Sequence, residues 1–268
     1  MSRENTIPQP PAHLRRARAL GIAGAIGSVV LLIVVLLTMN LPPWQRVLSG
    51  LQRNIPPLWR GFTNPETEIL PLALTAMMET FYMAVLGTLL GGVLAFGISF
   101  VAARNLLGGT AQAAPGKALL VAIRTFPEIL LAIIFVAAVG PGPTAGIMAM
   151  GIHSIGFLGK IFSDVIEGID PGPLEAIRAS GGNSVHVFLF AVVPQVLPEF
   201  LSYVLYRFEI NLRAASILGL VGAGGIGGPL IQRLQFRRWD EISMLLIVMI
   251  AFVIVVDAVS SRIRRRLV

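Results

Sequence analysis

The chain has 268 residues, of which 55% are hydrophobic and only 13% are charged, and it contains no cysteine. A water-soluble domain of this size carries roughly a quarter charged residues, so much of this chain's surface does not face water. The net charge of +7 does not indicate nucleic-acid binding, because the arginines gather at the chain ends and between apolar runs. The lack of cysteine excludes disulfides and thiolate metal sites. We expect an all-α integral membrane protein.

Six apolar stretches predict transmembrane helices, each of which needs about 20 residues to cross a bilayer. They cover residues 19–39, 69–103, 118–140, 144–169, 188–211 and 242–261. The first exceeds the core of a signal peptide and lacks a small-residue cleavage site, so we expect it to be retained. The expected parts are a cytoplasmic tail (1–18), a first transmembrane helix (19–40), an external interfacial segment (41–68) and a five-helix core (69–268).

Arginine clusters set the expected topology. Six spans put both termini on one side, and arginines at residues 15–18 and 262–266 make that side the cytoplasm by the positive-inside rule. The loops at 104–117 and 170–187 then also face the cytoplasm. Arginines at positions 46, 53, 60, 233, 237 and 238 fall outside and oppose this assignment in part.

The segment between the fourth and fifth spans carries the most informative motif. Glu175-Ala176-Ile177 is followed by Gly181-Gly182 and, further on, by Ala191-Val192-Val193-Pro194. The prolines at 171 and 173 favour a helix start, with Glu175 in the first turn, where the helix dipole favours a carboxylate. The two glycines end that helix, and Asn183 can cap a second one. The pattern predicts two short helices at an angle, with small residues that let a partner approach.

This segment resembles the coupling motif of ABC-importer permeases, which reads Glu-Ala-Ala, three residues, Gly, nine residues, Ile, one residue and Leu-Pro. Glu175, Ala176, Gly181 and Pro194 match the motif, whereas positions 177, 191 and 193 differ in type but stay apolar or small. The stretches at 79–80, 86–91, 124–128, 151–156, 159–160 and 216–227 resemble phosphonate permeases in particular. The resemblance covers about residues 75–260.

The resemblance implies a type I ABC-importer permease with six transmembrane helices and a cytoplasmic coupling-helix elbow. Its ATPase-coupling residues would be Glu175, Ala176, Ile177, Gly181, Gly182 and Pro194. The implied partners are a second copy of the chain, two ATP-binding cassette subunits on the cytoplasmic side and an extracytoplasmic solute-binding protein. All would assemble at a bacterial cytoplasmic (inner) membrane. This chain would bind no cofactor, since ATP and Mg would be held by the partner ATPase.

The implied function is ATP-driven import of phosphonate, phosphate or phosphite by alternating access, without catalysis by this chain. Methionine, betaine and sulfonate remain open as other solutes. A membrane-embedded enzyme is the alternative of a different class, although its common motifs, H-E-x-x-H and G-x-S-x-G, are absent.

Charged residues inside the spans indicate the translocation path, because ionisable groups in lipid usually face a cavity or a partner. The expected path residues are Arg124, Glu128, His153, Lys160 and Arg213. Local i, i+4 ion pairs are the structural alternative for Arg124 with Glu128, and such a pair is also expected for Lys160 with Asp164. Glutamates 79, 199 and 209 could pair with arginines 207 or 213.

A glycine-rich segment before the last span fits G-x-G-x-x-G literally through Gly222, Gly224 and Gly227. Membrane spans flank it and Pro229 follows, so a dinucleotide site is not expected. Irregular backbone at membrane depth must be buried in protein or line a cavity, so we expect Gly222, Gly224, Gly225 and Gly227 to form a gate. The Gly-Lys pairs at 116–117 and 159–160 lack the Ser or Thr of a P-loop. No metal site is expected.

Overall fold

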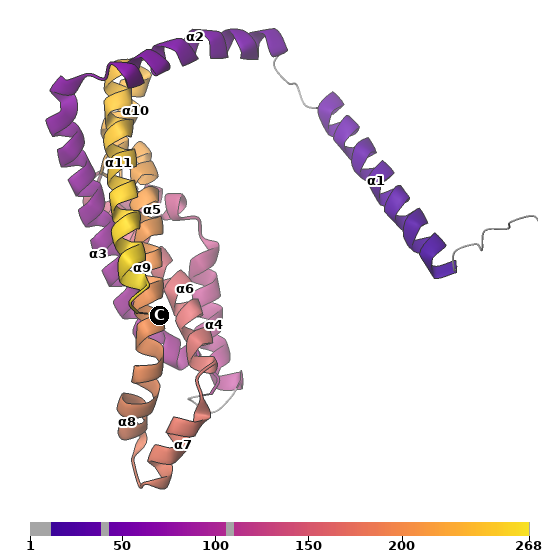
Figure 1. The fold of residues 1–268 in the computed structure, drawn as a ribbon, viewed down its shortest axis with the longest axis vertical. Helices are drawn as coiled ribbons and strands as arrows, with labels where there is room; N and C mark the ends of the chain where they lie inside the picture. The colour runs from indigo at the N-terminus through magenta and orange to yellow at the C-terminus, as the bar shows by residue number, and fades with distance from the viewer. Residues whose placement is uncertain (1–11, 39–42, 106–109, 268) are drawn as a thin grey trace, which may run out of the picture. The chain divides into compact units, whose positions relative to one another are not determined.

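The computed structural model describes residues 12–38, 43–105 and 110–267, and every regular element in this part of the chain is helical (Figure 1). The chain divides into two units, Met1–Ile55 and Pro56–Val268. In the first unit, α1 (Ala12–Thr38) begins inside the predicted tail, whose residues 1–11 lie outside the described part. Its segment Leu20–Thr38 is apolar enough to cross a membrane.

The predicted interfacial segment forms an amphipathic helix, α2 (Trp44–Thr63), followed by a 3-10 turn at Thr67–Ile69. Trp44, Leu48, Leu51 and Ile55 recur at helical spacing, while polar and arginine residues occupy the intervening positions. One apolar face and one basic face are typical of a helix that lies in the membrane interface rather than across it.

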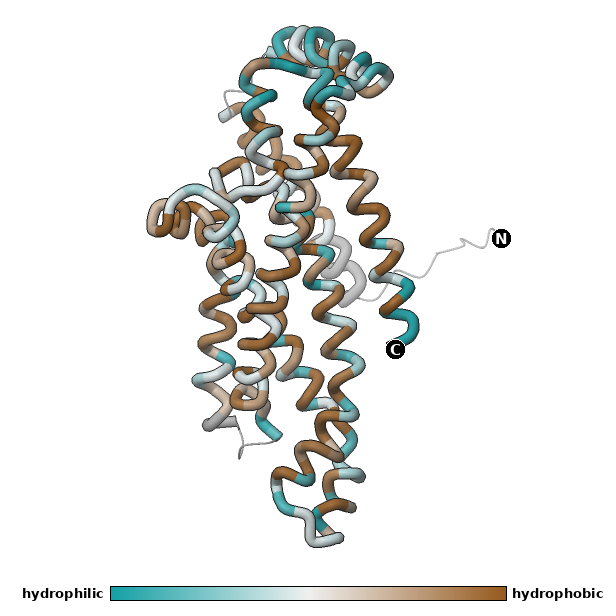
Figure 2. Tube along the Cα trace, turned by 90° about the vertical axis from the view of Figure 1, so that its left-hand side faces the viewer, coloured by the Kyte–Doolittle hydropathy of each residue, from teal (hydrophilic) through white to brown (hydrophobic). Residues whose placement is uncertain are grey.

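The second unit contains the remaining helices. They are α3 (Leu70–Ala102), α4 (Thr110–Thr125), α5 (Glu128–Val139), α6 (Pro143–Glu167), α7 (Pro171–Ala179), α8 (Ser184–Val187), α9 (Val193–Leu218), α10 (Gly227–Gln235) and α11 (Trp239–Arg264). Hydrophobic residues dominate the long helices in Figure 2. Five helices of the described chain are long and apolar enough to span a membrane, and the bent pair α4–α5 makes a sixth candidate. The expected six-span, all-α fold is confirmed.

The third predicted span is not one continuous helix. Its two halves, α4 and α5, meet at Phe126-Pro127 and are bent by 80°. Proline has no N–H to donate and disfavours helical backbone at the residue before it, so the helix stops there. Arg124 and Glu128 consequently lie on different helices, and the i, i+4 pair considered as the structural alternative for them does not form.

The fifth predicted span is longer than the range 188–211. It runs without interruption from α8 through a π-helical turn at Phe188–Val192 into α9, which ends at Leu218. The polar residues Arg207 and Asn211, both fully buried, therefore lie within the helix rather than near its end.

The most extensive helix packing in the second unit joins α3 to α6. Glycines make this approach possible: a Cβ at Gly87 would lie 2.9 Å from Met150 Cβ, and one at Gly91 would lie 2.7 Å from the Gly151 carbonyl oxygen and still closer to Ser154. On the other face of α6, a Cβ at Gly156 would lie 2.8 Å from the backbone nitrogen of Arg124 in α4. In lipid, where burial of apolar surface gives little drive, such close backbone contact stabilises helix pairs.

Aromatic packing ties the end of the helix bundle to the segment that follows α6. Phe162 of α6 stacks on Phe200 of α9, with ring centroids 3.9 Å apart and ring planes 8° from parallel. Leu174 of α7 and Val187 of α8 are buried in the same apolar cluster. The helices after α6 are therefore anchored in the core of the bundle.

The α3–α6 contact leads to a prediction with an internal control. We expect Gly91→Ala to lower the thermal midpoint of the purified protein, because the added methyl group meets Ser154 and overpacking costs about 1–3 kcal/mol. Gly97→Ala lies in the same helix, and a Cβ there has no atom within 4 Å. This control should keep the midpoint or raise it, since alanine favours helix over glycine. Equal midpoints for the two variants would contradict the importance of the contact.

Coupling segment and membrane-embedded ion cluster

The first helix of the predicted coupling segment is α7. The Asp170 side chain caps it by accepting a hydrogen bond from the backbone N–H of Gly172 at 2.9 Å. Since α7 starts at Pro171, Glu175 is its fifth residue, and the expected place in the first turn was wrong. Gly181 ends the turn after α7 with φ +82°, a conformation that glycine adopts without strain. The Gly182 N–H then donates to the Ile177 carbonyl at 2.9 Å, which closes the helix end.

The second predicted helix is capped as expected but is not separate. Asn183 Oδ1 accepts from the His186 N–H at 3.0 Å and starts α8. Because α8 continues through the π-helical turn into α9, it is the first turn of the fifth membrane helix. Pro194 directly follows the π-helical turn inside this continuous helix, where it has no N–H to donate to the preceding turn.

The predicted coupling residues form an accessible tip. Glu175, Ala176 and Gly181 are exposed, whereas Ile177 and Gly182 are half-buried. In Figure 1, α7 and α8 lie at the extreme end of the second unit, remote from α10. A small-residue surface at such a position is open to a partner protein.

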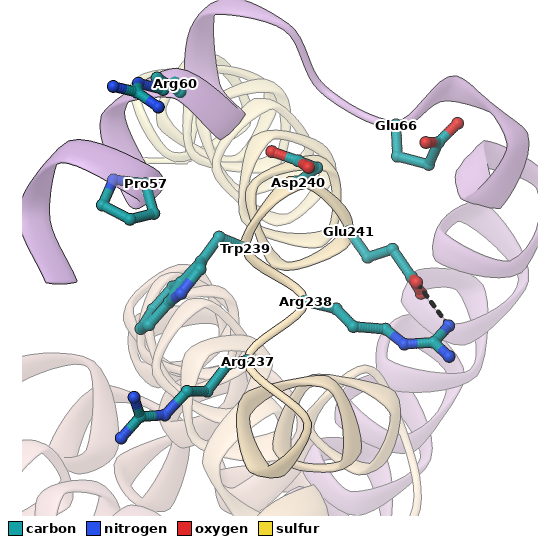
Figure 3. Close-up of a pocket in the computed structure, with 8 residues that line it drawn as sticks. All are labelled: Pro57, Arg60, Glu66, Arg237, Arg238, Trp239, Asp240 and Glu241. Atoms are coloured by element: carbon teal, nitrogen blue, oxygen red, sulfur yellow. Dashed lines mark hydrogen bonds and ion pairs between the residues drawn. The ribbon is translucent and has the colours of Figure 1, made fainter. Parts of the chain in front are cut away.

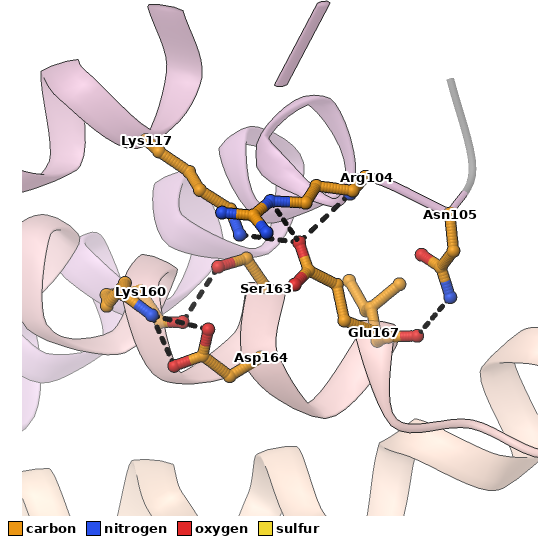
Figure 4. Close-up of polar contacts among 8 residues, drawn as sticks. Arg104, Asn105, Lys117, Lys160, Ser163, Asp164 and Glu167 are labelled. Carbon is orange, nitrogen blue, oxygen red and sulfur yellow. Dashed lines mark hydrogen bonds and ion pairs between the residues drawn. The ribbon is translucent and has the colours of Figure 1, made fainter. Parts of the chain in front are cut away.

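Gln195, which the sequence reading missed, fastens the base of this segment. Its Oε1 accepts from the Asp170 N–H at 3.0 Å, while its Nε2 donates to the Ala191 carbonyl at 2.8 Å. On the other side of the segment, Glu167 pairs with Lys117 of α4 at 2.6 Å and accepts from the Arg104 N–H at 3.0 Å (Figure 4). Gln195 of α9 thus holds the start of α7, and Lys117 of α4 and Arg104, just after α3, hold the end of α6 that precedes it.

A cluster of polar residues is buried between α5, α6 and α9. The Arg207 side chain, which is 3% exposed, donates through Nη2 to Glu128 Oε2 at 3.3 Å. The same Nη2 lies 2.8 Å from His153 Nδ1, and His153 Nδ1 is 3.4 Å from Glu128 Oε2. Two predicted path residues are therefore brought together by an arginine that was considered only as a partner for other glutamates.

Further contacts fix the position of the Arg207 guanidinium. Its Nε donates to Ser154 Oγ at 2.9 Å, and Asn211 Nδ2 donates to the same oxygen at 3.0 Å. Asn211 also donates to Thr88 Oγ1 of α3 at 2.8 Å. The carbon centre of the guanidinium lies 5.1 Å from the Phe157 ring centroid, within the range of a cation–π contact. Buried polar groups in lipid need such partners.

Two other predicted path residues line a separate cavity. Arg124 is exposed, and the carbon centre of its guanidinium lies 5.9 Å from the Phe157 ring centroid. Among the described residues, no carboxylate forms a salt bridge with it. It borders a cavity of about 260 Å³ together with Lys160. Lys160 pairs with Asp164, so the predicted i, i+4 pair is confirmed (Figure 4).

Arg213 is not part of either group. It pairs with Asp257 of α11 at 3.2 Å, and its side chain is 46% exposed. Glu209 pairs with Arg264 of α11, and neither it nor Glu79 pairs with the two arginines that the sequence had offered. Long-range partners of this kind depend on helix packing and have no signal in sequence spacing.

The glycine-rich segment is irregular and mostly buried, as expected. Gly222, Gly224 and Gly225 have φ values of +86°, +85° and +75°, which require glycine. Glu79 and Thr80 of α3 hold it: Glu79 Oε1 accepts from the Gly225 N–H at 2.9 Å, and Thr80 Oγ1 accepts from the Ile226 N–H at 2.8 Å. Gly227 packs directly on Ser216 and Gly219.

Beyond the glycine-rich segment lies a charged pocket of about 410 Å³ (Figure 3). It is lined by Pro57, Arg60, Glu66, Arg237, Arg238, Trp239, Asp240 and Glu241. Glu241 pairs with Arg238 at 2.8 Å and with Arg233 at 3.0 Å. The pocket lies at the end of the second unit away from α7, where α11 begins (Figure 1).

Comparisons with known proteins identify the fold and the family. Residues 95–268 match the family described as binding-protein-dependent transport system inner membrane component. The chain is 38% identical over 264 residues to the phosphite transport system permease protein PtxC of Stutzerimonas stutzeri, covering 94% of this chain and 93% of that protein. It is 40% identical over 194 residues to the phosphate-import permease protein PhnE of Mycolicibacterium smegmatis, covering 72% of this chain and 36% of that protein.

Among solved structures, the inward-facing MetNI methionine ABC transporter matches with a TM-score of 0.66 at 20% identity, covering 76% of this chain and 99% of that chain. This likeness supports the type I importer fold that the helix order and the coupling segment already indicate. Together with the family match, it shows that the chain is a multi-pass inner-membrane protein and belongs to the permease subunits of ABC importers, in the phosphonate branch of that family.

Proposed function

We propose that this permease imports a small phosphorus oxyanion, namely a phosphonate, phosphate or phosphite, across the bacterial cytoplasmic membrane by alternating access. The observation that carries this proposal is the 38% identity with a phosphite permease over nearly the whole of both chains. By comparison, a probable D-methionine permease of Vibrio cholerae is only 24% identical over 200 residues. The buried Arg207 and the exposed Arg124 and Lys160 suit an anion better than a neutral or zwitterionic solute.

Partner subunits would supply the energy. We propose that two ATP-binding cassette subunits hold ATP and Mg and hydrolyse the nucleotide, that two copies of this chain form the channel, and that an extracytoplasmic solute-binding protein delivers the anion. The exposed tip around Glu175, Ala176 and Gly181 supports the first of these, because it offers a small-residue surface at one end of the bundle. The solved importers that share this fold support the general assembly.

The path and the gate would lie between the two ends of the bundle. Arg124 and Lys160 border one cavity, and Glu128 and His153 meet in the buried cluster. Arg213 would contact the anion only through the exposed part of its side chain, because its guanidinium is paired with Asp257. The left-handed turns at Gly222 and Gly224, in the segment that α3 holds, would act as the gate on the far side.

For topology, we propose a cytoplasmic tail over residues 1–18, a first transmembrane helix over 19–40, an external interfacial segment over 41–68 and a permease core over 69–268, with both termini cytoplasmic. The arginines that close α11 support this, and α11 ends toward the same end of the bundle as α7 (Figure 1). Because the chain has no cysteine, single cysteines report sidedness without background. In intact spheroplasts, Gln235→Cys should react with a membrane-impermeant maleimide, and Ser180→Cys should react only after permeabilisation. The reverse pattern would invert the topology.

Transport itself gives the direct test. The permease is co-purified with its ATPase, reconstituted in proteoliposomes and supplied with its solute-binding protein. We expect ATP-dependent accumulation of phosphite, phosphate or methylphosphonate at least tenfold above vesicles that contain a non-hydrolysable nucleotide, and no accumulation of methionine. ATP-driven uptake of methionine without uptake of any phosphorus oxyanion would refute the substrate assignment.

The turn after α7 provides a test of coupling. Gly181→Val should reduce stimulation of the ATPase by loaded binding protein at least fivefold in an assembled complex. A β-branched residue cannot adopt φ +82° without a cost of about 1–2 kcal/mol, and a Cβ there has no atom within 4 Å, so the effect is confined to the backbone. Gly181→Asn is the matched control, because asparagine tolerates this conformation, and it should retain most of the stimulation. Normal stimulation in Gly181→Val would exclude a coupling role for the turn.

A further inference from the structure

The hydrogen bonds of Arg207 are incomplete on one side. A guanidinium has five N–H donors in a planar fork. Nε donates to Ser154, and Nη2 faces Glu128 and His153, whereas Nη1 donates to no acceptor among the described residues. Glu128 is equally incomplete: its Oε2 makes the 3.3 Å contact, and its Oε1 is buried without a hydrogen-bond partner. A stable arginine–carboxylate pair uses two parallel bonds at shorter distances.

The partners of Arg207 differ in how firmly they are held. Ser154 is fixed within α6 and shared with Asn211, which is itself bonded to Thr88 of α3. Phe157 covers one face of the guanidinium. Glu128, in contrast, is the first residue of α5, directly after the break at Pro127 where the chain bends by 80°. The arginine is therefore rigidly placed, while its counter-ion lies beside the hinge of a broken helix.

From this asymmetry we infer that Arg207 is an anion-binding site on the translocation path, and that a tetrahedral phosphorus oxyanion binds there by displacing the carboxylate of Glu128. The identity of the anion rests on the proposed function; the site itself rests on the geometry. Two oxygens of a phosphonate or phosphite match the two terminal nitrogens of the guanidinium fork, one of which has no other acceptor.

Charge balance gives the exchange its physical basis. An unpaired charge buried in the protein is strongly destabilising, so Arg207 always requires an anionic partner. Exchange of the Glu128 carboxylate for the substrate anion keeps Arg207 paired at every stage. The substrate is not trapped, because Glu128 competes for Arg207 Nη2 and can replace the substrate there. The side chains of Glu128 and His153, 14% and 18% exposed, form the accessible edge of the cluster. The anion would approach from that edge.

Anion binding is tested on the complete permease–ATPase complex, without transport. The probe is methylphosphonate, because inorganic phosphate is also a product of the ATPase. In the wild-type complex we expect the thermal midpoint to rise with methylphosphonate concentration and to saturate. Glu128→Gln should lower the half-saturating concentration at least tenfold, because the competing carboxylate is gone. Arg207→Lys keeps the charge but loses the fork, and should raise that concentration at least tenfold.

A matched control distinguishes anion binding from general loss of an ion pair. Arg264→Gln removes the Arg264–Glu209 pair, which joins α11 to α9. Among the described residues, this pair makes no hydrogen bond to the polar cluster around Arg207. It should lower the midpoint without methylphosphonate and leave the half-saturating concentration unchanged. An equal shift of the half-saturating concentration in Arg264→Gln would contradict the proposal. So would unchanged values in both Glu128→Gln and Arg207→Lys, or no saturable rise in the wild type.

The outcome separates this inference from the proposed function. Suppose that the wild type takes up a phosphorus oxyanion with ATP, but the half-saturating concentration of methylphosphonate does not change in Arg207→Lys or Glu128→Gln. This result would leave the proposed function intact and refute the site. Absence of uptake, combined with Arg207-dependent binding, would leave the site intact and refute the function. If Arg207→Lys fails to assemble, the Glu128→Gln result alone decides, because a purely structural pair predicts no increase in anion affinity.

Discussion

Helices α3 and α6 approach so closely at Gly91 that one additional methyl group would meet Ser154, and the rest of the second unit depends on this contact. It brings Ser154 of α6 next to α3, whose Thr88 lies one turn away from Gly91 and holds Asn211 of α9. Ser154 then serves as the common acceptor for Asn211 and Arg207. The close approach of α3 and α6 at glycine thereby positions a polar cluster in a region where unpaired polar groups would be costly.

Helix α9 connects the three functional regions. Its continuation through the π-helical turn starts at the coupling segment, where Gln195 holds Asp170. Its middle carries Arg207 and Asn211 in the polar cluster. Its end leads into the glycine-rich turns that Glu79 and Thr80 hold against α3. A displacement at the coupling segment therefore has a continuous, rigid route to the buried arginine and to the irregular segment beyond it.

The two ends of the bundle are stabilised differently. At the coupling end, Glu167 forms an ion pair with Lys117 and accepts a hydrogen bond from the Arg104 N–H. These contacts join the end of α6, just before α7, to α4 and to the segment after α3. At the far end, hydrogen bonds hold the glycine-rich segment: Glu79 and Thr80 of α3 accept from its backbone N–H groups, Leu218 and Gly219 accept from two further N–H groups, and the Gly142 N–H donates to the Gly222 carbonyl.

The sequence by itself determined the membrane spans, the all-α fold and the family, because hydropathy and the Glu175–Gly181 spacing are local patterns. Local chemistry also predicted the Asn183 cap and the Lys160–Asp164 pair. The tertiary structure alone decided which charges meet. Arg124 and Glu128 are four residues apart, yet Pro127 turns the helix and gives Glu128 to Arg207, 79 positions away. A side chain's partner inside a membrane depends on which helix faces pack together, and no spacing rule encodes that choice.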